Sequence, residues 1–104
     1  MVYLIVGDYL RDEAFSAFQA VEEMLILGGH EVYNPYKSMV TGCPKSHQTY
    51  KMYESIAKLY LPYVDAVYLM KGYDYVPNIA FRNLLAAIYA DGRKKIQIER
   101  LQSG

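Results

Sequence analysis

Short apolar runs alternate along the chain with longer segments in which apolar residues recur at helical spacing. Four runs predict β-strands at Val2–Val6, Glu31–Tyr33, Ala66–Met70 and Lys95–Ile98. Each strand is followed or preceded by a predicted helix, and a long segment separates the second strand from the second helix. The order strand, helix, strand, loop, helix, strand, helix, strand is typical of a parallel α/β sheet.

Each of the three predicted helices has one apolar stripe that is expected to face the sheet. The stripes are Ala14, Phe18, Val21 and Leu25 in the first helix, Met52, Ile56, Leu59 and Tyr63 in the second, and Phe81, Leu84, Leu85 and Ile88 in the third. Gly28 and Gly29 supply the stop for the first helix, Pro62 ends or bends the second, and Asp91 with Gly92 ends the third.

Right-handed crossovers between these strands favour a doubly wound sheet with strand order 2-1-3-4 and helices on both faces. Such sheets bind ligands beyond the carboxyl ends of the strands, where the chain direction switches between the first and third strands. Four segments are expected to meet there: Gly7 to Tyr9, Asn34 with Pro35, Tyr36 to His47, and Lys71 to Asn78. The long segment from Tyr36 to His47 is predicted to be a binding loop, a lid or a partner contact.

Length and charge narrow the field of functions. A chain of 104 residues fits one domain, residues 1–104, with a single core. Basic and acidic residues both number 11, so the net charge is zero and the broad basic field that duplex nucleic acid requires is missing. A single cysteine excludes a disulfide within the chain and indicates a reducing compartment, the cytoplasm. The first apolar run ends at Gly7, too short for a signal-peptide core or a membrane span.

Common catalytic and cofactor signatures are missing from the sequence. It contains no P-loop, no dinucleotide-binding glycine motif, no H-E-x-x-H and no paired C-x-x-C. His30, Cys43 and His47 could be imagined as metal ligands, but closed zinc sites need four ligands at recognisable spacing. We therefore expect neither a metal nor a cofactor. Cys43 has no base partner at local spacing, so a plain free thiol is favoured over a nucleophile.

The stretch "DAVYLMKGYDYVPNIAFRNLLAAIYA", from Asp65 to Ala90, resembles the signature segment of the nucleoside 2-deoxyribosyltransferase-like superfamily. The likeness is to its small phage and bacterial branch, in which a D-A-V-Y-x-L strand precedes Gly-Trp, a variable turn and a helix with an acidic residue. "VYLIVG" is similar to the family's first strand and glycine, and "AVEEMLILGGHEVYNP" is similar to its first helix, glycine turn and Asn-Pro. The resemblance implies a flavodoxin-like three-layer sandwich that binds a nucleoside or nucleotide near the first, third and fourth strands.

In active members of that family a glutamate on the third helix attacks the anomeric carbon of the sugar, and an upstream aspartate helps to protonate the base. The resemblance places Arg82 at the position of this glutamate, and a guanidinium can neither attack carbon nor stabilise positive charge on a sugar. The upstream aspartate falls near Glu54 or Ser55 without a clear match, and Asp8 stands where the family has a proline. Asp8 and Asp74 are the carboxylates that could substitute in catalysis.

The residues expected to bind the ligand lie on the strand-end segments and at the start of the third helix. They are Gly7, Asp8, Tyr9, Asn34, Gly72, Tyr73, Asn78 and Arg82. Structural alternatives remain for each: Arg82 contacts an anionic ligand group or forms a surface ion pair with Asp8 or Asp74. Tyr73 stacks on a base or packs, the two glycines serve a ligand or a tight turn, and Asp8 caps the first helix. The two asparagines cap a helix or build an Asn-Pro turn.

Three hypotheses follow from these observations. The favoured one is a non-catalytic nucleoside or nucleotide binder in which Arg82 holds an anionic group. The second is an enzyme that cleaves or transfers at the N-glycosidic bond with a relocated carboxylate. The third is a homo-oligomeric interaction module, since the tyrosines of the long segment and the next helix, Tyr36, Tyr50 and Tyr53, would suit a symmetric interface.

Overall fold

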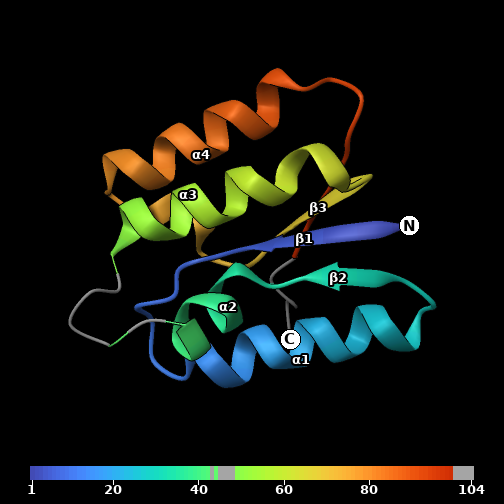
Figure 1. Cartoon of the computed structure of the whole chain (residues 1–104), viewed down its shortest axis with the longest axis horizontal. Coiled ribbons are helices and arrows are strands. Elements are labelled where there is room, and N and C mark those ends of the chain that lie inside the picture. The colour runs from blue at the N-terminus through green and yellow to red at the C-terminus, as the bar shows by residue number, and fades with distance from the viewer. Residues whose placement is uncertain (43, 45–48, 100–104) are drawn as a thin grey trace, which may run out of the picture.

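The structure, a computed structural model, describes residues 1–42, 44 and 49–99 (Figure 1). Its sheet consists of β1 (Val2–Val6), β2 (Glu31–Tyr33), β3 (Ala66–Leu69) and β4 (Lys95–Ile98). The strands are all parallel and lie in the order β2-β1-β3-β4, which confirms the predicted topology. The third strand ends one residue earlier than predicted.

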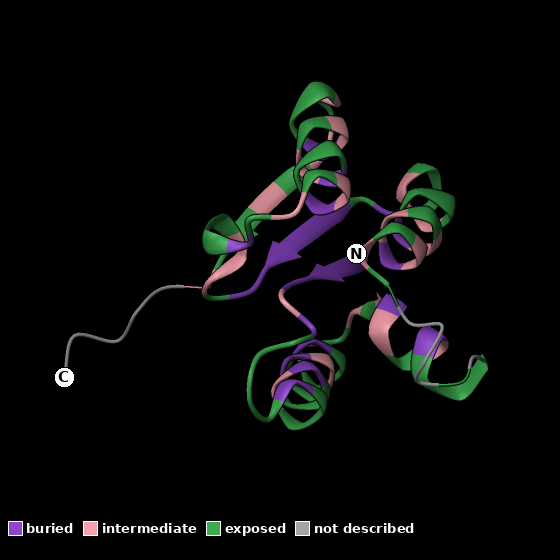
Figure 2. Cartoon of the chain, turned by 90° about the vertical axis from the view of Figure 1, so that its left-hand side faces the viewer, coloured by how far each residue is buried: buried purple, intermediate pink, exposed green. Residues whose placement is uncertain are grey.

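The described residues form four α-helices, which pack around this sheet in a three-layer arrangement. α1 (Ala14–Leu27) covers one face, while α3 (Tyr50–Tyr60) and α4 (Ile79–Ala90) lie side by side on the other, as Figure 2 shows. α2 (Pro35–Gly42) packs against α3 and, less extensively, α1. This arrangement is the flavodoxin-like α/β sandwich that the sequence predicts.

The two central strands form the middle of the core. All of β3 and all of β1 except Val2 are buried, because helices cover both faces of these strands. The edge strand β4 is more exposed, and its Ile98 keeps 47% of its surface in solvent. The predicted buried residues of α1 and α4 are confirmed, with Leu85 only partly buried.

The predicted buried stripe of α3 is right only in part, because Met52 and Ile56 are half-buried against the core and the fully buried residues lie one position further along the helix. Tyr53 and Ala57 face the core, whereas Leu59 is 70% exposed and Tyr63 is 73% exposed. The reason is polar: the hydroxyl of Tyr53 donates to the carbonyl of Ile5 at 3.1 Å, so this tyrosine can be fully buried without an unpaired oxygen.

The prediction of one long loop from Tyr36 to His47 is also wrong in part, because α2 occupies Pro35–Gly42. Asn34 initiates this helix: its Oδ1 accepts from the backbone N–H of Lys37 at 3.2 Å. Pro35 then occupies the first helical position, where a missing N–H costs nothing. Residues 43 and 45–48, with Cys43 and His47 among them, lie outside the described residues.

Helix ends follow the predicted signals. α1 is followed by Gly28 and by Gly29, whose φ of 87° is in the left-handed region that glycine accepts readily. α3 ends just before Pro62, which lies in the short 3-10 helix η2 (Leu61–Tyr63). Within the described ranges, no helix combines the length and apolar character needed to cross a bilayer.

Candidate functional site

The end of β1 places Gly7 at the centre of the carboxyl edge of the sheet. Its N–H donates to the hydroxyl of Tyr53 at 3.3 Å. A Cβ at this position would lie 2.9 Å from the Cβ of Met70, the residue after β3. The close approach that this glycine permits is therefore to Met70.

Asp8 connects the end of β1 with the start of α3. Its Oδ1 accepts from the hydroxyl of Tyr50 at 2.8 Å and from the backbone N–H of Leu10 at 3.0 Å. Burial, followed by this hydrogen bond and the charge of Asp8, raises the pKa of Tyr50. The alternative that Asp8 caps the first helix is wrong, because Glu13 occupies the N-cap of α1 and makes no side-chain capping bond.

Tyr9 packs into an aromatic cluster at this edge. Its ring lies 4.9 Å from that of Tyr50, 5.7 Å from that of Tyr36 and 5.8 Å from that of Tyr53, measured between centroids. Only 6% of Tyr9 is exposed, and burial raises the pKa of its hydroxyl, with the charge of Asp8 adding to the shift. Because neighbouring rings cover it, Tyr9 is part of the packing at this edge of the sheet and does not offer an open surface on which a base could stack.

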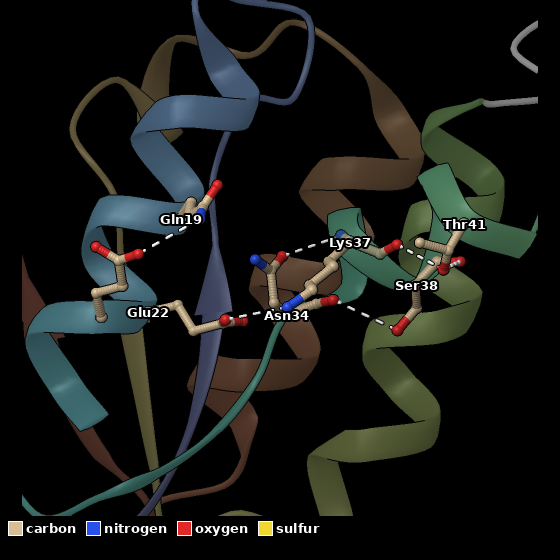
Figure 3. Close-up of polar contacts among 7 residues, drawn as sticks. Gln19, Glu22, Asn34, Lys37, Ser38 and Thr41 are labelled. Atoms are coloured by element: carbon tan, nitrogen blue, oxygen red, sulfur yellow. Dashed lines mark hydrogen bonds and ion pairs between the residues drawn. The ribbon is translucent and has the colours of Figure 1, made fainter.

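A cavity of about 90 Å³ lies beside Asn34, between α1 and α2. Its lining residues are Phe15, Phe18, Gln19, Glu22, Asn34, Tyr36 and Lys37. Asn34 follows β2 and is buried, and Figure 3 shows its amide nitrogen turned toward α1. The cavity thus combines aromatic walls with an amide and a carboxylate, as ligand sites commonly do.

Two charged residues of opposite sign, Glu22 and Lys37, line this cavity. Oε2 of Glu22 pairs with Nζ of Lys37 at 3.4 Å, which connects α1 to α2 (Figure 3). The Glu22 side chain is only 15% exposed, whereas that of Lys37 is 59% exposed. The neighbouring Gln19 donates to Glu23 on the same helix at 3.3 Å. Glu22 carries no signal of its own in the sequence, because only the unpredicted helix α2 places Lys37 opposite α1.

The turn after β3 contains Gly72, Tyr73 and Asp74, and it continues into the 3-10 helix η3 (Tyr73–Tyr75). Gly72 has a φ of 88°, so the turn itself requires glycine. The hydroxyls of Tyr73 and Tyr89 lie 3.3 Å apart, which holds Tyr73 against α4. Asp74 is exposed.

Asn78 and Arg82 form the beginning of α4. Oδ1 of Asn78 accepts from the N–H groups of Ala80 at 2.9 Å and Phe81 at 3.4 Å. Asn78 is therefore the N-cap of α4, which is the structural alternative to a ligand-binding role. Arg82 is exposed, and among the described residues no ion pair joins it to Asp8, Asp74 or another carboxylate. The alternative of a surface ion pair for Arg82 therefore has no support in this arrangement.

The predicted ligand residues fall into two groups. Gly7, Asp8 and Tyr9 share the aromatic cluster with Tyr50 and Tyr53, and Tyr36 connects this cluster to the cavity beside Asn34. Gly72 and Tyr73 belong to the turn after β3, and Asn78 and Arg82 belong to the start of α4, the helix that lies on the sheet face opposite α1. Arg82 is not among the described residues that line the cavity.

No His, Cys, Asp or Glu cluster within the described ranges is arranged to hold a metal ion. Comparison with known proteins adds no relative: no family model matches the chain, and no curated protein or solved structure is significantly similar to it. The likeness to the nucleoside 2-deoxyribosyltransferase-like superfamily therefore stays a prediction from the motifs.

Proposed function

We propose that the protein is a cytoplasmic domain that binds a nucleoside or nucleotide at the carboxyl edge of its sheet. The observation that carries the proposal is the cavity beside Asn34, which lies at the carboxyl end of the edge strand β2, one strand away from the switch point between β1 and β3. Its aromatic and hydrogen-bonding lining suits a heterocyclic base. The motif resemblance points to the same ligand class.

Binding is favoured over catalysis because of the residue in the first turn of α4. Arg82 occupies the position that the resemblance assigns to the attacking glutamate, and its charge has the wrong sign for an oxocarbenium-like transition state. An exposed guanidinium with no ion-pair partner among the described residues is available to a phosphate from solution. Arg82 does not line the cavity beside Asn34, so phosphate binding by Arg82 is a separate proposal from base binding in the cavity.

A ligand panel tests the proposal. Thermal unfolding is followed with deoxynucleosides and their 5′-monophosphates, and a bound ligand at 100 times its Kd raises the free energy of unfolding by about 2.7 kcal/mol. We expect at least one member of the panel to raise the Tm in a saturable manner. No change with any member at millimolar concentration would overturn the proposal.

The role of Arg82 has its own test. If Arg82 contacts phosphate, the monophosphate binds more tightly than the nucleoside. Arg82→Gln should then lower the ratio of the two affinities by about tenfold. Arg93→Gln is the matched control, because Arg93 is also exposed, follows the other end of α4 and has the same charge. Equal affinities for both ligands in the wild type would remove Arg82 from the site, while leaving nucleoside binding intact.

The enzymatic alternative rests on Asp8. This half-buried carboxylate lies at the carboxyl edge and accepts a hydrogen bond from Tyr50 at 2.8 Å, which would orient it toward a reacting sugar. Release of free base from deoxynucleosides, lost in Asp8→Asn and retained in Asp74→Asn, would establish this activity. Base release that survives Asp8→Asn would rule out Asp8 as the reacting group.

Self-association is a further proposal and is compatible with either activity. The tyrosines expected to form its interface do not support one, because Tyr53 is fully buried and Tyr36 and Tyr50 pack against Tyr9. Three apolar side chains near the end of α1 are exposed: Met24 at 47%, Ile26 at 53% and Leu27 at 88%. If they form a homo-oligomer interface, Leu27→Lys lowers the mass measured by light scattering. Leu59→Lys, at an exposed leucine on α3, leaves the mass unchanged. A monomeric wild type would exclude the proposal.

A further inference from the structure

The cavity between α1 and α2 presents one side-chain amide donor that no described residue of the chain accepts. Asn34 uses Oδ1 for the N–H of Lys37, which fixes the orientation of its amide group. Its Nδ2 faces α1 (Figure 3) and makes no hydrogen bond to any other described residue. A carbonyl oxygen is the natural partner for an amide N–H held at the wall of a cavity.

The same cavity presents a carboxylate whose present partner is easily replaced. Glu22 Oε2 pairs at 3.4 Å with a lysine whose side chain is 59% exposed, and such exposed ion pairs contribute little to stability. Glu22 Oε1 accepts no hydrogen bond from the part of the chain that the structure describes. Two ligand N–H groups could therefore bind both oxygens of Glu22 while Lys37 swings toward solvent.

The walls determine how a ligand enters. Phe15 is 47% exposed at the mouth, and its ring meets that of Tyr36 edge-on, with centroids 6.1 Å apart. No ring can pass between these two side chains. A cavity of about 90 Å³ corresponds to roughly three water molecules, so it takes the polar edge of a ring system while the rest lies against Phe15.

We propose that this cavity reads the edge of a guanine-type base, with Glu22 accepting its two adjacent N–H groups and Asn34 donating to its carbonyl oxygen. Guanine places a carbonyl, a ring N–H and an amino group side by side, which matches one donor and one two-oxygen acceptor. Hypoxanthine lacks the amino group, and adenine has no carbonyl for Asn34. The inference rests on the proposed nucleoside binding and names the base.

Calorimetric titration with guanosine, inosine and adenosine tests this reading of the base. We expect guanosine to bind at least about tenfold more tightly than inosine or adenosine, because a site built for hydrogen-bonding groups rejects analogues that lack them. Glu22→Gln should weaken guanosine binding by about tenfold or more, since its amide nitrogen faces a ligand N–H. Glu23→Gln, the adjacent glutamate whose partner is Gln19, is the matched control and should leave affinity unchanged.

A second variant separates the base contact from the integrity of α2. Asn34→Asp keeps the Oδ1 acceptor that caps α2 but converts the donor into an acceptor, so the fold is retained while guanosine affinity falls. Near-equal melting temperatures of the variants confirm that folding is intact. Guanosine binding that is unaffected by Glu22→Gln and Asn34→Asp would overturn this inference and leave nucleoside binding standing. The absence of binding by all three nucleosides would overturn both.

Discussion

Tyr53 carries a hydroxyl into the centre of the core, and its removal should be costly. The hydroxyl donates to the carbonyl of Ile5 at 3.1 Å and accepts from the N–H of Gly7 at 3.3 Å. Both backbone groups lie beyond the end of β2. Continuing the parallel register of β1 and β2, the next donor to Ile5 would be Pro35, which has no N–H. The hydroxyl of Tyr53 therefore replaces the backbone hydrogen bonds that β2 cannot make to β1 at this level.

Tyr53→Phe leaves this carbonyl and this N–H without their partner in a fully buried place. Each unsatisfied buried polar group costs about 1–3 kcal/mol, and two such groups would remain. Part of this cost is offset, because phenylalanine has no hydroxyl that must be removed from water on folding. We expect a net loss of about 2 kcal/mol in urea unfolding, which for a domain of this size lowers the Tm by roughly 10 °C.

Tyr63→Phe is the control for this substitution, because Tyr63 is 73% exposed and its change should stay within about 0.5 kcal/mol. A loss below about 0.5 kcal/mol for Tyr53→Phe would refute the reasoning. It would mean that water or a backbone shift satisfies Ile5 and Gly7 without the tyrosine.

Three further predictions concern packing, capping and pH. Gly7→Ala places a Cβ 2.9 Å from the Cβ of Met70 and should cost about 1–3 kcal/mol in urea unfolding; an unchanged midpoint would contradict the close packing. Asn78→Ala removes the acceptor of two N–H groups and should cost about 1 kcal/mol, whereas Asn78→Asp should retain most of it. The hydrogen bond between the hydroxyls of Tyr89 and Tyr73, followed by burial, raises the pKa of Tyr89 from 10.0 to about 12, as expected if the protonated Tyr89 hydroxyl donates. Its stabilising effect is therefore complete below pH 10 and lost as pH approaches 12, and the ultraviolet difference titration between wild type and Tyr89→Phe should have its midpoint near pH 12. A midpoint near pH 10 would show that the two hydroxyls do not interact.

The sheet could be predicted from the sequence because its signals are local. The run Val2–Val6 is apolar throughout, as a strand buried on both faces must be, and right-handed crossovers then determine the strand order. The stripe Phe18, Val21 and Leu25 is equally clear. Each of these residues is buried because its side chain is apolar, and no polar contact to another element is needed to explain its position.

The register of α3 could not be predicted in the same way. Tyr53 competes with Met52 and Ile56 for the core face, and hydrophobicity alone favours the latter pair. What decides in favour of Tyr53 is a pair of unpaired backbone groups at Ile5 and Gly7, which belong to another element. Such a long-range polar demand leaves no trace in the helical period.

The candidate site was predictable only in its location. Asn34 follows from the rule that ligands bind at the carboxyl ends of parallel strands, and it does line a cavity. Glu22 and Phe15 belong to the outer part of a helix, where charged and exposed residues are ordinary, and only the unpredicted α2 turns that surface into a wall. Tyr9 was placed at the correct edge, but the rings around it could not be foreseen.

The central claim, a nucleoside-binding site at the carboxyl edge of the sheet, is tested most directly by nuclear magnetic resonance during titration with guanosine 5′-monophosphate. The account predicts saturable shifts concentrated on the side-chain amide of Asn34 and on the backbone around Phe15, Glu22 and Lys37, with little change in β4. Saturable shifts that leave these residues untouched would place the ligand elsewhere, and a spectrum that stays the same at millimolar ligand would contradict the claim altogether.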